Sequence, residues 1–335
     1  MATSQVQIGQ NIDGIASGEW FGYSVATSAD GSVIAVGAPR SAVNGIISSG
    51  KVRVFQHISG TWAQIGQDIE GILSGEGTGY SISLSSNGKI IAIGNPWDNN
   101  GNNSAGYVQV YQNVSGVWTQ LGQDITGNVV GEQFGYSVAL SSDGTILAAG
   151  VPYYAGNGGT RSGQVRVYRN VSGTWTQIGQ DIDDGEFSGE FSGWEISLSS
   201  DGDILAVGRL RNSIAANSSG LVRVYRNVSG NWIQIGQDIV GEGIYDTSAG
   251  VSLSADGSVV AIGAPHNNNV NGSGGSGHVR IYRNISGNWF KIGADIDGEG
   301  TNDNSGYSVS LSADGNVVAI GAPNNNDNGN YSGHV

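Results

Sequence analysis

The sequence predicts an all-β fold assembled from six copies of one unit. Three observations support this prediction: a phrase that recurs at a fixed step, strand-like alternation within each copy, and abundant Gly with few charged residues. The phrase IGQDI, or a close variant, begins at six equally spaced positions: Ile8, Ile65, Leu121, Ile178, Ile235 and Ile292. The steps between them are 57, 56, 57, 57 and 57 residues. Self-similarity at such a period indicates a repeat architecture that covers essentially the whole chain.

The third copy illustrates the strands that we expect in each unit. GYSVALSS, from Gly135, alternates large and small side chains with a period of two, which is typical of a strand. Asp143-Gly144 predicts a tight hairpin turn with positive φ angles. TILAAGVP is an apolar run of the kind found in a strand that is covered on both faces. After a Gly- and Asn-rich loop, QVRVY and TWTQIGQDI provide two more strands around an RNVSG turn, and no window shows a helical period.

Four short antiparallel strands per copy predict the blades of a six-bladed β-propeller, with residues 1–335 as a single domain. A solenoid is the alternative, although its units usually run shorter and parallel. The chain begins with a fourth strand, in SQVQIGQNI, and ends in a copy that lacks one. We therefore expect the N-terminal strand to join the C-terminal blade and close the ring, which leaves no free sheet edge. Since the last copy is shorter than the others, we expect the chain to be part of a longer protein.

Composition excludes several classes of function. The formal net charge of -14 disfavours nucleic acid and anionic membrane surfaces as partners. The absence of Cys excludes disulfides, thiolate metal sites and cysteine nucleophiles. No apolar stretch is long enough for a transmembrane helix, so we expect no membrane insertion. The N-terminal MATSQVQIGQ lacks the basic and apolar segments of a signal peptide.

The recurring phrase also carries a family resemblance. Phe21-Gly22 with Gly37-Ala38-Pro39 resembles the FG-GAP repeat of the integrin α-subunit propeller, and all six copies share the pattern with some erosion. The chain is more similar still to long bacterial and algal surface proteins with units such as WTQIGQDIDGE, GYSVSLSADG and SGHVRVY. The resemblance implies a propeller, an extracellular or cell-surface location, and a role in binding or adhesion. It implies no particular ligand.

The same family often binds calcium in its hairpins through an Asp-x-Asp-x-Asp-Gly loop, and here the sequence departs from the pattern. The corresponding loops, such as TSADG and SSNG, hold at most two carboxylates, whereas Ca²⁺ takes six to eight oxygen ligands. Asp201 and Asp203 form the one pair of acids within such a loop. We therefore expect no metal or other cofactor, and folding that does not require calcium.

Other recurring residues are interpreted as structural. The four histidines, two of them at one repeated position, do not form the converging set that a triad or zinc site needs (His57, His266, His278 and His334). One Trp recurs before each fourth strand and is expected to pack within a blade (Trp62, Trp118, Trp175, Trp232 and Trp289). Four Asn-x-Ser sequences match the glycan acceptor pattern, but they also suit turns (Asn113, Asn170, Asn227 and Asn284).

A Gly-Glu pair precedes the first strand of every copy. In a propeller these loops share a face with the loops between strands two and three, so the sequence predicts a ring of acids there: Glu19, Glu76, Glu132, Glu190, Glu242 and Glu299. The ring is either a solvated acidic rim or a cation-assisted binding surface. Glycoside hydrolysis would need a distinct pair of acids, whereas every copy carries the same one, so we do not expect an enzyme.

The loop sequences differ from copy to copy, whereas the strand sequences are nearly the same in all copies. This pattern favours a binding module on a rigid scaffold. Copies two to four carry aromatic and basic residues in or beside their loops: Trp97, Tyr153, Tyr154, Arg161, Phe187, Phe191, Trp194, Arg209 and Arg211. Of these we predict Trp97, Tyr153, Tyr154, Trp194, Arg161 and Arg211 as ligand-binding residues. The competing interpretation is that the aromatics fold down and cap the blades.

Together these features predict an extracellular recognition or adhesion module that binds a protein or glycan on a surface through its loop face. Two alternatives stay open. One is a lectin with repeated sugar sites, and the other is a structural spacer or assembly subunit without a soluble ligand.

Overall fold

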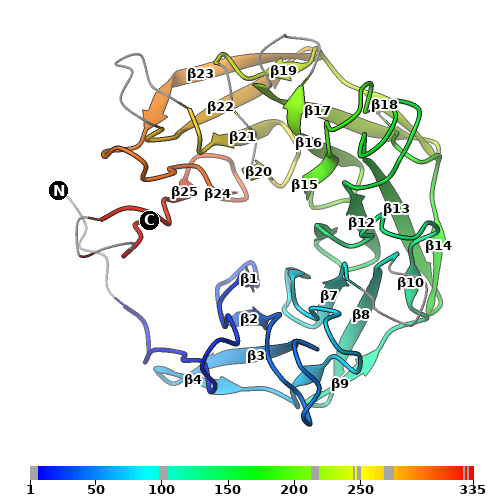
Figure 1. The fold of residues 1–335 in the computed structure, drawn as a ribbon, viewed down its shortest axis with the longest axis vertical. Helices are drawn as coiled ribbons and strands as arrows, with labels where there is room; N and C mark the ends of the chain where they lie inside the picture. The colour runs from blue at the N-terminus through cyan, green and yellow to red at the C-terminus, as the bar shows by residue number, and fades with distance from the viewer. Residues whose placement is uncertain are drawn as a thin grey trace. The chain divides into compact units, whose positions relative to one another are not determined.

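The computed structural model describes residues 7–97, 105–183, 185–212, 219–243, 246, 250–267, 275–326, 329 and 332–335. Within these residues the chain is all-β, built from antiparallel strands joined by turns and loops (Figure 1). No helix in the described part is long and apolar enough to span a membrane. The chain divides into two compact units, one of Met1–Gly135 with Ser172–Thr174 and the other of Tyr136–Val171 with Trp175–Val335.

The first unit contains two sheets, and in each the third strand carries a short additional pairing. The first sheet has the order β1-β2-β3-β4, with β5 also paired to β3. In the second, β6, β7 and β8 are successive neighbours, and β9 and β10 both pair with β8. The strands are β1 (Ser24–Thr27), β2 (Val33–Ala38), β3 (Lys51–Ile58), β4 (Thr61–Gln64), β5 (Ile69–Glu70), β6 (Ser81–Leu84), β7 (Ile90–Asn95), β8 (Tyr107–Val114), β9 (Val117–Gln120) and β10 (Ile125–Thr126).

The second unit repeats this arrangement. Three of its sheets contain four strands in chain order, one of them with a fifth strand in addition, and the last sheet has two strands. The strands of the first two sheets are β11 (Val138–Leu140), β12 (Ile146–Val151), β13 (Gln164–Val171), β14 (Thr174–Gln177), β15 (Ser192–Leu198), β16 (Ile204–Asn212), β17 (Ser219–Val228), β18 (Asn231–Gln234) and β19 (Ile239–Val240), which pairs with β17. The others are β20 (Gly250–Leu253), β21 (Val259–Ala264), β22 (His278–Ile285), β23 (Asn288–Asp297), β24 (Ser308–Leu311) and β25 (Val318–Gly321).

The prediction of four antiparallel strands per copy is therefore confirmed for five of the six copies. In the sixth, β24 and β25 are followed by a single bridge between Ala322 and His334. The closing strand was expected in SQVQIGQNI, of which the first three residues lie outside the described part of the chain. The described residues from 7 to 23 contain no strand. The number of blades, the closure of the ring and the assignment of one domain stay predictions.

The hairpin turns correct one expectation. At Asp30-Gly31 only Gly31 has a positive φ, of 68°, and its N–H donates to Ser28 O at 2.9 Å. The Asp side chain instead accepts from the Ser28 hydroxyl and the Ser32 N–H, which fixes the loop. The two-residue turn with two positive φ angles lies at the Ser-Gly pairs, such as Ser115 (52°) and Gly116 (87°) between β8 and β9. That geometry matches the twist of the flanking strands.

The recurring FG and GAP glycines mark close approaches between successive sheets. A Cβ on Gly150, in β12, would lie 2.1 Å from the carbonyl oxygen of Gly193 in the next copy. The same collision would occur between Gly37 and the oxygen of Gly79, at 2.2 Å. Since no larger residue fits, the phrase repeats for architectural reasons.

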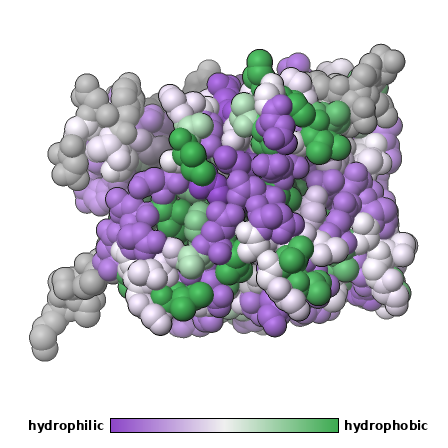
Figure 2. Space-filling model, turned by 90° about the horizontal axis from the view of Figure 1, so that it is seen from below, coloured by the Kyte–Doolittle hydropathy of each residue, from purple (hydrophilic) through white to green (hydrophobic). Residues whose placement is uncertain are grey.

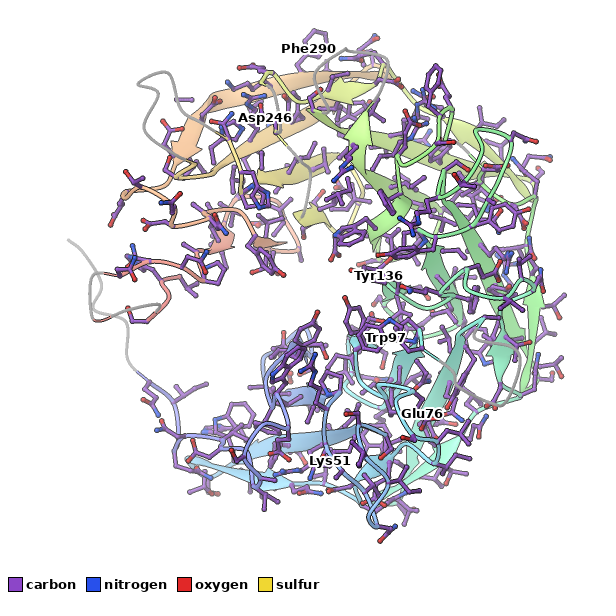
Figure 3. All side chains as sticks on the ribbon, viewed as in Figure 1. Lys51, Glu76, Trp97, Tyr136, Asp246 and Phe290 are labelled. Atoms are coloured by element: carbon purple, nitrogen blue, oxygen red, sulfur yellow. The ribbon has the colours of Figure 1, made fainter. Side chains whose placement is uncertain are left out.

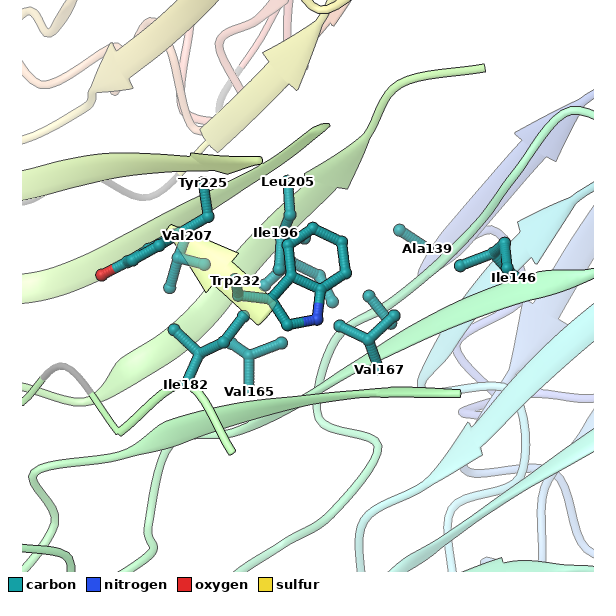
Figure 4. Packing of buried hydrophobic residues seen from close by; sticks show 11 residues of the cluster. Ala139, Ile146, Val165, Val167, Ile182, Ile196, Leu205, Val207, Tyr225 and Trp232 are labelled. Carbon is teal, nitrogen blue, oxygen red and sulfur yellow. The ribbon is translucent and has the colours of Figure 1, made fainter. Parts of the chain in front are cut away.

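Apolar side chains fill the space between neighbouring sheets. Figure 4 shows one such core, in which Trp232 packs with Val167, Leu205 and Val207. The indole N–H of Trp232 donates to Ile178 O at 3.2 Å, in the preceding IGQ phrase. All five recurring Trp residues are 2–8% exposed, which confirms that they pack within the fold.

Candidate functional site

The six Glu residues of the predicted ring are the first candidates, and four of them are buried. Glu19, Glu76, Glu132 and Glu190 are at most 3% exposed. Each carboxylate accepts the backbone N–H of the residue four positions earlier, at 2.5–2.7 Å. These bonds close the loop that leads into the first strand. The four side chains therefore do not form a solvated rim, which was one of the two interpretations of the predicted ring.

Glu242 and Glu299 are exposed, by 65% and 73%. In their two copies the buried position is held by Asp246 and Asp303, which accept the N–H of Gly243 and Gly300. Figure 3 shows Glu76 and Asp246 on their loops. The sequence carries a signal for this register, because a Gly stands five residues before every buried acid (Gly14, Gly71, Gly127, Gly185, Gly241 and Gly298).

The buried carboxylates have different second partners in different copies. Lys51 lies 3.3 Å from Glu19, the Tyr107 hydroxyl donates to Glu76 at 2.9 Å, and Arg209 pairs with Glu190 at 3.1 Å. Burial alone would raise the pKa of Glu19, but hydrogen bonds from Ile15 and Ala16 and the nearby ammonium group bring it below its usual value. The carboxylates are thus held by the protein's own donors, as expected of structural groups.

Aromatic side chains form a second set of candidates, divided between the two units. In the first unit Trp97 meets Tyr80 edge to face, with ring centroids 4.5 Å apart. Tyr80 continues to Tyr23 at 5.0 Å, and Tyr23 stacks on Trp20 at 5.5 Å. The guanidinium of Arg40 lies 3.5 Å from the centroid of Trp20. Of the predicted ligand-binding residues, this unit holds Trp97 alone.

The second unit holds four rings in mutual contact, which we call the aromatic cluster: Tyr136, Tyr153, Phe191 and Trp194. Centroid distances are 4.6 Å between Tyr136 and Trp194, 5.4 Å between Tyr153 and Phe191, and 5.9 Å between Phe191 and Trp194. All four side chains are half-buried, so each ring has one part against the fold and another open to solvent. The structure brings Tyr153 and Trp194 together as predicted and adds Tyr136, which the sequence presented only as a strand residue. Its position after Gly135 matches that of Trp194 after Gly193, a signal that could have found it.

Two exposed arginines flank the aromatic cluster. Arg161 lies 5.6 Å from the centroid of Tyr153, and Arg211 lies 6.0 Å from that of Phe191. They line an open pocket together with hydroxyl, glycine and aromatic groups (Thr160, Arg161, Ser188, Gly189, Phe191 and Arg211). Within the described residues, neither arginine forms a salt bridge. We call this feature the arginine pocket.

The other predicted residues of this region have different environments. Arg209 is fully buried against Glu190, so it does not supply the surface charge that was expected of it. Tyr154 lies 5.9 Å from the buried Arg166 and outside the aromatic cluster. Phe187 is 47% exposed. The loops are joined by backbone bonds, including Phe191 N–H to Arg161 O at 3.0 Å.

The remaining candidates behave as structural groups. His57 contacts the ring of Trp62, with centroids 5.1 Å apart, and burial lowers the pKa of His278. Asp201 accepts from Ser199 and from the backbone of Asp203, as a hairpin residue does. Among the described residues there is no group of three or more His, Asp and Glu that could hold a metal ion.

The glycan acceptor sequences lie in tight turns. The side-chain oxygen of Asn227 accepts the N–H of Gly230 at 2.8 Å. The Nδ2 atoms of Asn113 and Asn284, where a glycan would be attached, are buried. The folded structure therefore leaves no room for a glycan at these two atoms.

Glu195 stands out among the titratable groups because burial raises its pKa to about 8. It is half-buried on β15. Four other copies have Ser at this position and the fifth has Gly250. The hydroxyl of Ser137, for example, donates to Gly193 O at 2.9 Å. Glu195 therefore stands at a position where, in the third copy, a Ser side chain bonds to the next sheet.

Apolar residues are dispersed on the one side of the molecule that Figure 2 shows. On the side seen in Figure 2 they form separate small groups among hydrophilic residues. Large contiguous apolar patches usually mark interfaces between proteins. The described part of that side therefore offers no such patch, which directs attention to the aromatic cluster and its arginines.

Comparisons with known proteins identify the fold. The chain is similar to Kuenenia stuttgartiensis hydrazine synthase, with a TM-score of 0.60 and 15% identity over 94% of this chain and 78% of that one. It is also similar to a candidate 6-phosphogluconolactonase of Bacteroides uniformis, with a TM-score of 0.60 and 12% identity over 89% and 77% of the two chains. U3-55K matches with a TM-score of 0.53 and 13% identity, over 90% and 72%.

No protein-family model matches the sequence, and no curated protein matches it either. The structural neighbours support an all-β, propeller-like fold. Because they include an enzyme and a candidate enzyme at such low identity, the shared fold does not decide whether this chain is one. The FG-GAP pattern stays a resemblance.

Proposed function

We propose that the chain is a recognition or adhesion module whose contact surface is the aromatic cluster of the second unit. The observation that carries this proposal is the contact of four half-buried rings flanked by two arginines that have no carboxylate partner among the described residues. Such rings offer a large contact area at a low cost in side-chain entropy. Arginines that pair with no acid of their own are available to a ligand.

The proposed location is extracellular or at a cell surface, and it rests on the FG-GAP resemblance. The proposed ligand is a glycan or protein on a surface. We propose no enzymatic activity, because the loop carboxylates that recur from copy to copy, such as Glu76 and Glu190, are buried and accept backbone N–H groups. Carboxylates held in this way are not positioned for acid–base chemistry.

The two alternatives predict different behaviour. A lectin with repeated sites would need an equivalent set of rings in every copy, but the fifth copy has Ala249 and His266 at the positions of Trp194 and Tyr153. A structural spacer would need no partly exposed aromatic cluster. We therefore favour a single recognition surface on the second unit.

A binding array that carries saccharides and purified cell-surface proteins tests the proposal. The variants are Tyr153→Ala with Trp194→Ala, and the control Phe290→Ala. Phe290 is 51% exposed on β23, on the outer strands of the same unit (Figure 3). The proposal expects the wild type and the control to bind the same ligand, and the double variant to lose at least tenfold in affinity with an unchanged melting temperature. Binding that persists in the double variant would overturn it, and absence of any ligand would favour the spacer.

We also propose that the six copies form the blades of one closed propeller. The N-terminal segment supports this, because Gln10 and Ile8 bind Trp62 in the way that later copies bind the next Trp. Deletion of residues 1–12 would remove this contact and the closing strand together, whereas deletion of residues 1–5 spares the contact. A large loss of thermal stability in the shorter deletion supports closure, and an unchanged melting temperature contradicts it.

A further inference from the structure

We propose that the arginine pocket is an anion-binding subsite and that it takes the carboxylate or sulfate of an acidic saccharide. The inference rests on the proposed function, since it assigns a ligand class to the same face. It is carried by the pocket between Arg161 and Arg211 and by the rings beside it.

The charge of the pocket is the first step. The whole chain has twice as many acidic as basic residues, 28 against 14. In the described part of the second unit, four arginines pair with acids of the chain: Arg166, Arg209, Arg223 and Arg280. Arg161 and Arg211 are exposed, and no carboxylate lines the pocket between them. Two guanidinium groups facing one pocket are the arrangement that binds a planar carboxylate or a tetrahedral sulfate.

The nearest acid of the same loop does not neutralise the pocket. Glu186 precedes the pocket residue Ser188 by two positions, but its carboxylate pairs with Arg223 at 2.6 Å. Glu190, adjacent to Gly189, is buried and paired with Arg209. Neither of these two acids therefore compensates the positive charge of the pocket. At physiological ionic strength the repulsion from distant acids is screened beyond about 8 Å, so an anionic group can approach.

The rest of the lining favours a saccharide as the carrier of the anion. Thr160 and Ser188 place exposed hydroxyls at the pocket, which suit a ligand rich in hydroxyl groups. Phe191 forms one wall and contacts Tyr153 and Trp194, so flat apolar faces lie beside the guanidinium groups. Such a surface matches a sugar ring, which has an apolar face and polar edges. No aliphatic side chain lines the pocket to receive an apolar peptide residue.

The backbone around the pocket is held in an uncommon conformation. Arg161 and Phe191 both have positive φ angles, of 59° and 56°. This region is unfavourable for side chains other than Gly, Asn and Asp. In the second copy the residue in the position of Phe191 is Gly77, which adopts a φ of 69° without that cost. The chain thus keeps a large ring at a place where glycine would fit, and Phe191→Gly removes the ring without straining the backbone.

Titration calorimetry with defined hexasaccharides in 0.15 M NaCl tests the inference. The probes are hexagalacturonate, a chondroitin sulfate hexasaccharide, neutral maltohexaose and a hexaglutamate peptide. We expect one or both anionic saccharides to bind, and maltohexaose and hexaglutamate to bind at least tenfold more weakly. The two anionic probes separate carboxylate from sulfate as the recognised group.

The variant Arg161→Gln with Arg211→Gln is expected to lose at least tenfold in affinity for the anionic probe, and Phe191→Gly at least fivefold. The matched control is Arg169→Gln with Arg226→Gln, which removes the same charge from exposed positions on β13 and β17. All variants should keep the melting temperature within a few degrees. An equal loss in the control would mean that binding is only long-range attraction and would overturn the subsite.

The remaining outcomes separate this inference from the proposed function. If hexaglutamate binds as tightly as the saccharides, the saccharide assignment is wrong. If a ligand depends on Tyr153 and Trp194 but not on Arg161 and Arg211, the anion subsite fails and the recognition surface stands. If no ligand depends on either set, both fail.

Discussion

The side-chain amide of Gln67 hydrogen-bonds to both the backbone C=O and the backbone N–H of Trp118, which lies 51 residues further along the chain. Its amide nitrogen donates to Trp118 O at 2.7 Å, and its amide oxygen accepts Trp118 N–H at 3.1 Å. The indole N–H also donates to Ile65 O at 2.9 Å. Gln10, Gln180 and Gln237 bind the corresponding Trp of the next copy in the same way. These Gln–Trp hydrogen bonds between successive copies explain why the IGQ phrase recurs at the spacing of the repeat.

Gln67→Ala should therefore destabilise the protein by about 1–2 kcal/mol, because two partly buried hydrogen bonds between successive sheets are lost. Urea denaturation measures the change. Gln64→Ala is the matched control, since among the described residues the Gln64 side chain bonds only to Gly66 O and Asp68, both in the segment directly after β4. If both substitutions lowered the free energy of unfolding equally, the Gln67–Trp118 hydrogen bonds would not contribute to the joining of the sheets.

The buried carboxylates give a second prediction. Glu190→Gln leaves the guanidinium of Arg209 buried without its ionic partner and should cost about 3 kcal/mol. Glu242→Gln removes an acid that pairs with Arg280 at the surface and should cost less than about 1 kcal/mol. Thermal and urea unfolding of both variants distinguishes them. Similar losses would contradict the division into structural and exposed acids.

The hairpin aspartates predict a defined dependence on pH. Hydrogen bonds from Ser28 and Ser32 lower the pKa of Asp30 to about 2, and those from Ser312 and Asn316 do the same for Asp314. Since these values lie below those of the unfolded chain, the stabilisation is present above about pH 4 and is lost as the pH falls toward 2.

Asn87 makes the same bonds in the second copy without a charge, so Asp30→Asn with Asp314→Asn should keep the turns. The double variant should be less stable than the wild type at pH 7, and the difference should vanish near pH 2. Urea unfolding across this range measures it. A difference that is independent of pH would show that the charge has no part in the effect.

Glu195 predicts the opposite dependence. Because burial raises its pKa to about 8 in the folded state, its neutral form is favoured there, and stability is lost as the pH rises from about 4.5 to about 8. Glu195→Ser, which introduces the residue found in four other copies, should stabilise the protein by about 1–4 kcal/mol at pH 8 and have little effect at pH 4.5. A gain of the same size at both values would point to packing instead of charge.

Much of the fold could be predicted from the sequence because its signals are local and repeated. The alternation in GYSVALSS, the apolar second strand and the recurring Trp led to four-stranded sheets that the structure contains. The type of turn was harder to predict, since Asp-Gly and Ser-Gly both permit positive φ and only the side-chain bonds of Asp30 distinguish them.

The site was predicted less well, because exposure depends on tertiary contacts. A Gly-Glu pair reads as a surface loop, yet Glu132 and Glu190 are buried, and the true counterparts in the last copies are Asp246 and Asp303. Arg209 and Arg211 stand two residues apart on one strand and face different environments. Only packing shows that the first is bound internally and the second is open.

The most direct test of a recognition surface on the second unit is hydroxyl-radical footprinting of the wild-type chain, with and without the tightest ligand from the binding array. The aromatic rings report on contact because they react readily when exposed. We expect at least twofold protection of Tyr136, Tyr153, Phe191 and Trp194, with Phe290 unchanged. Protection that falls on Phe290 or elsewhere while these four rings stay equally reactive would contradict the account.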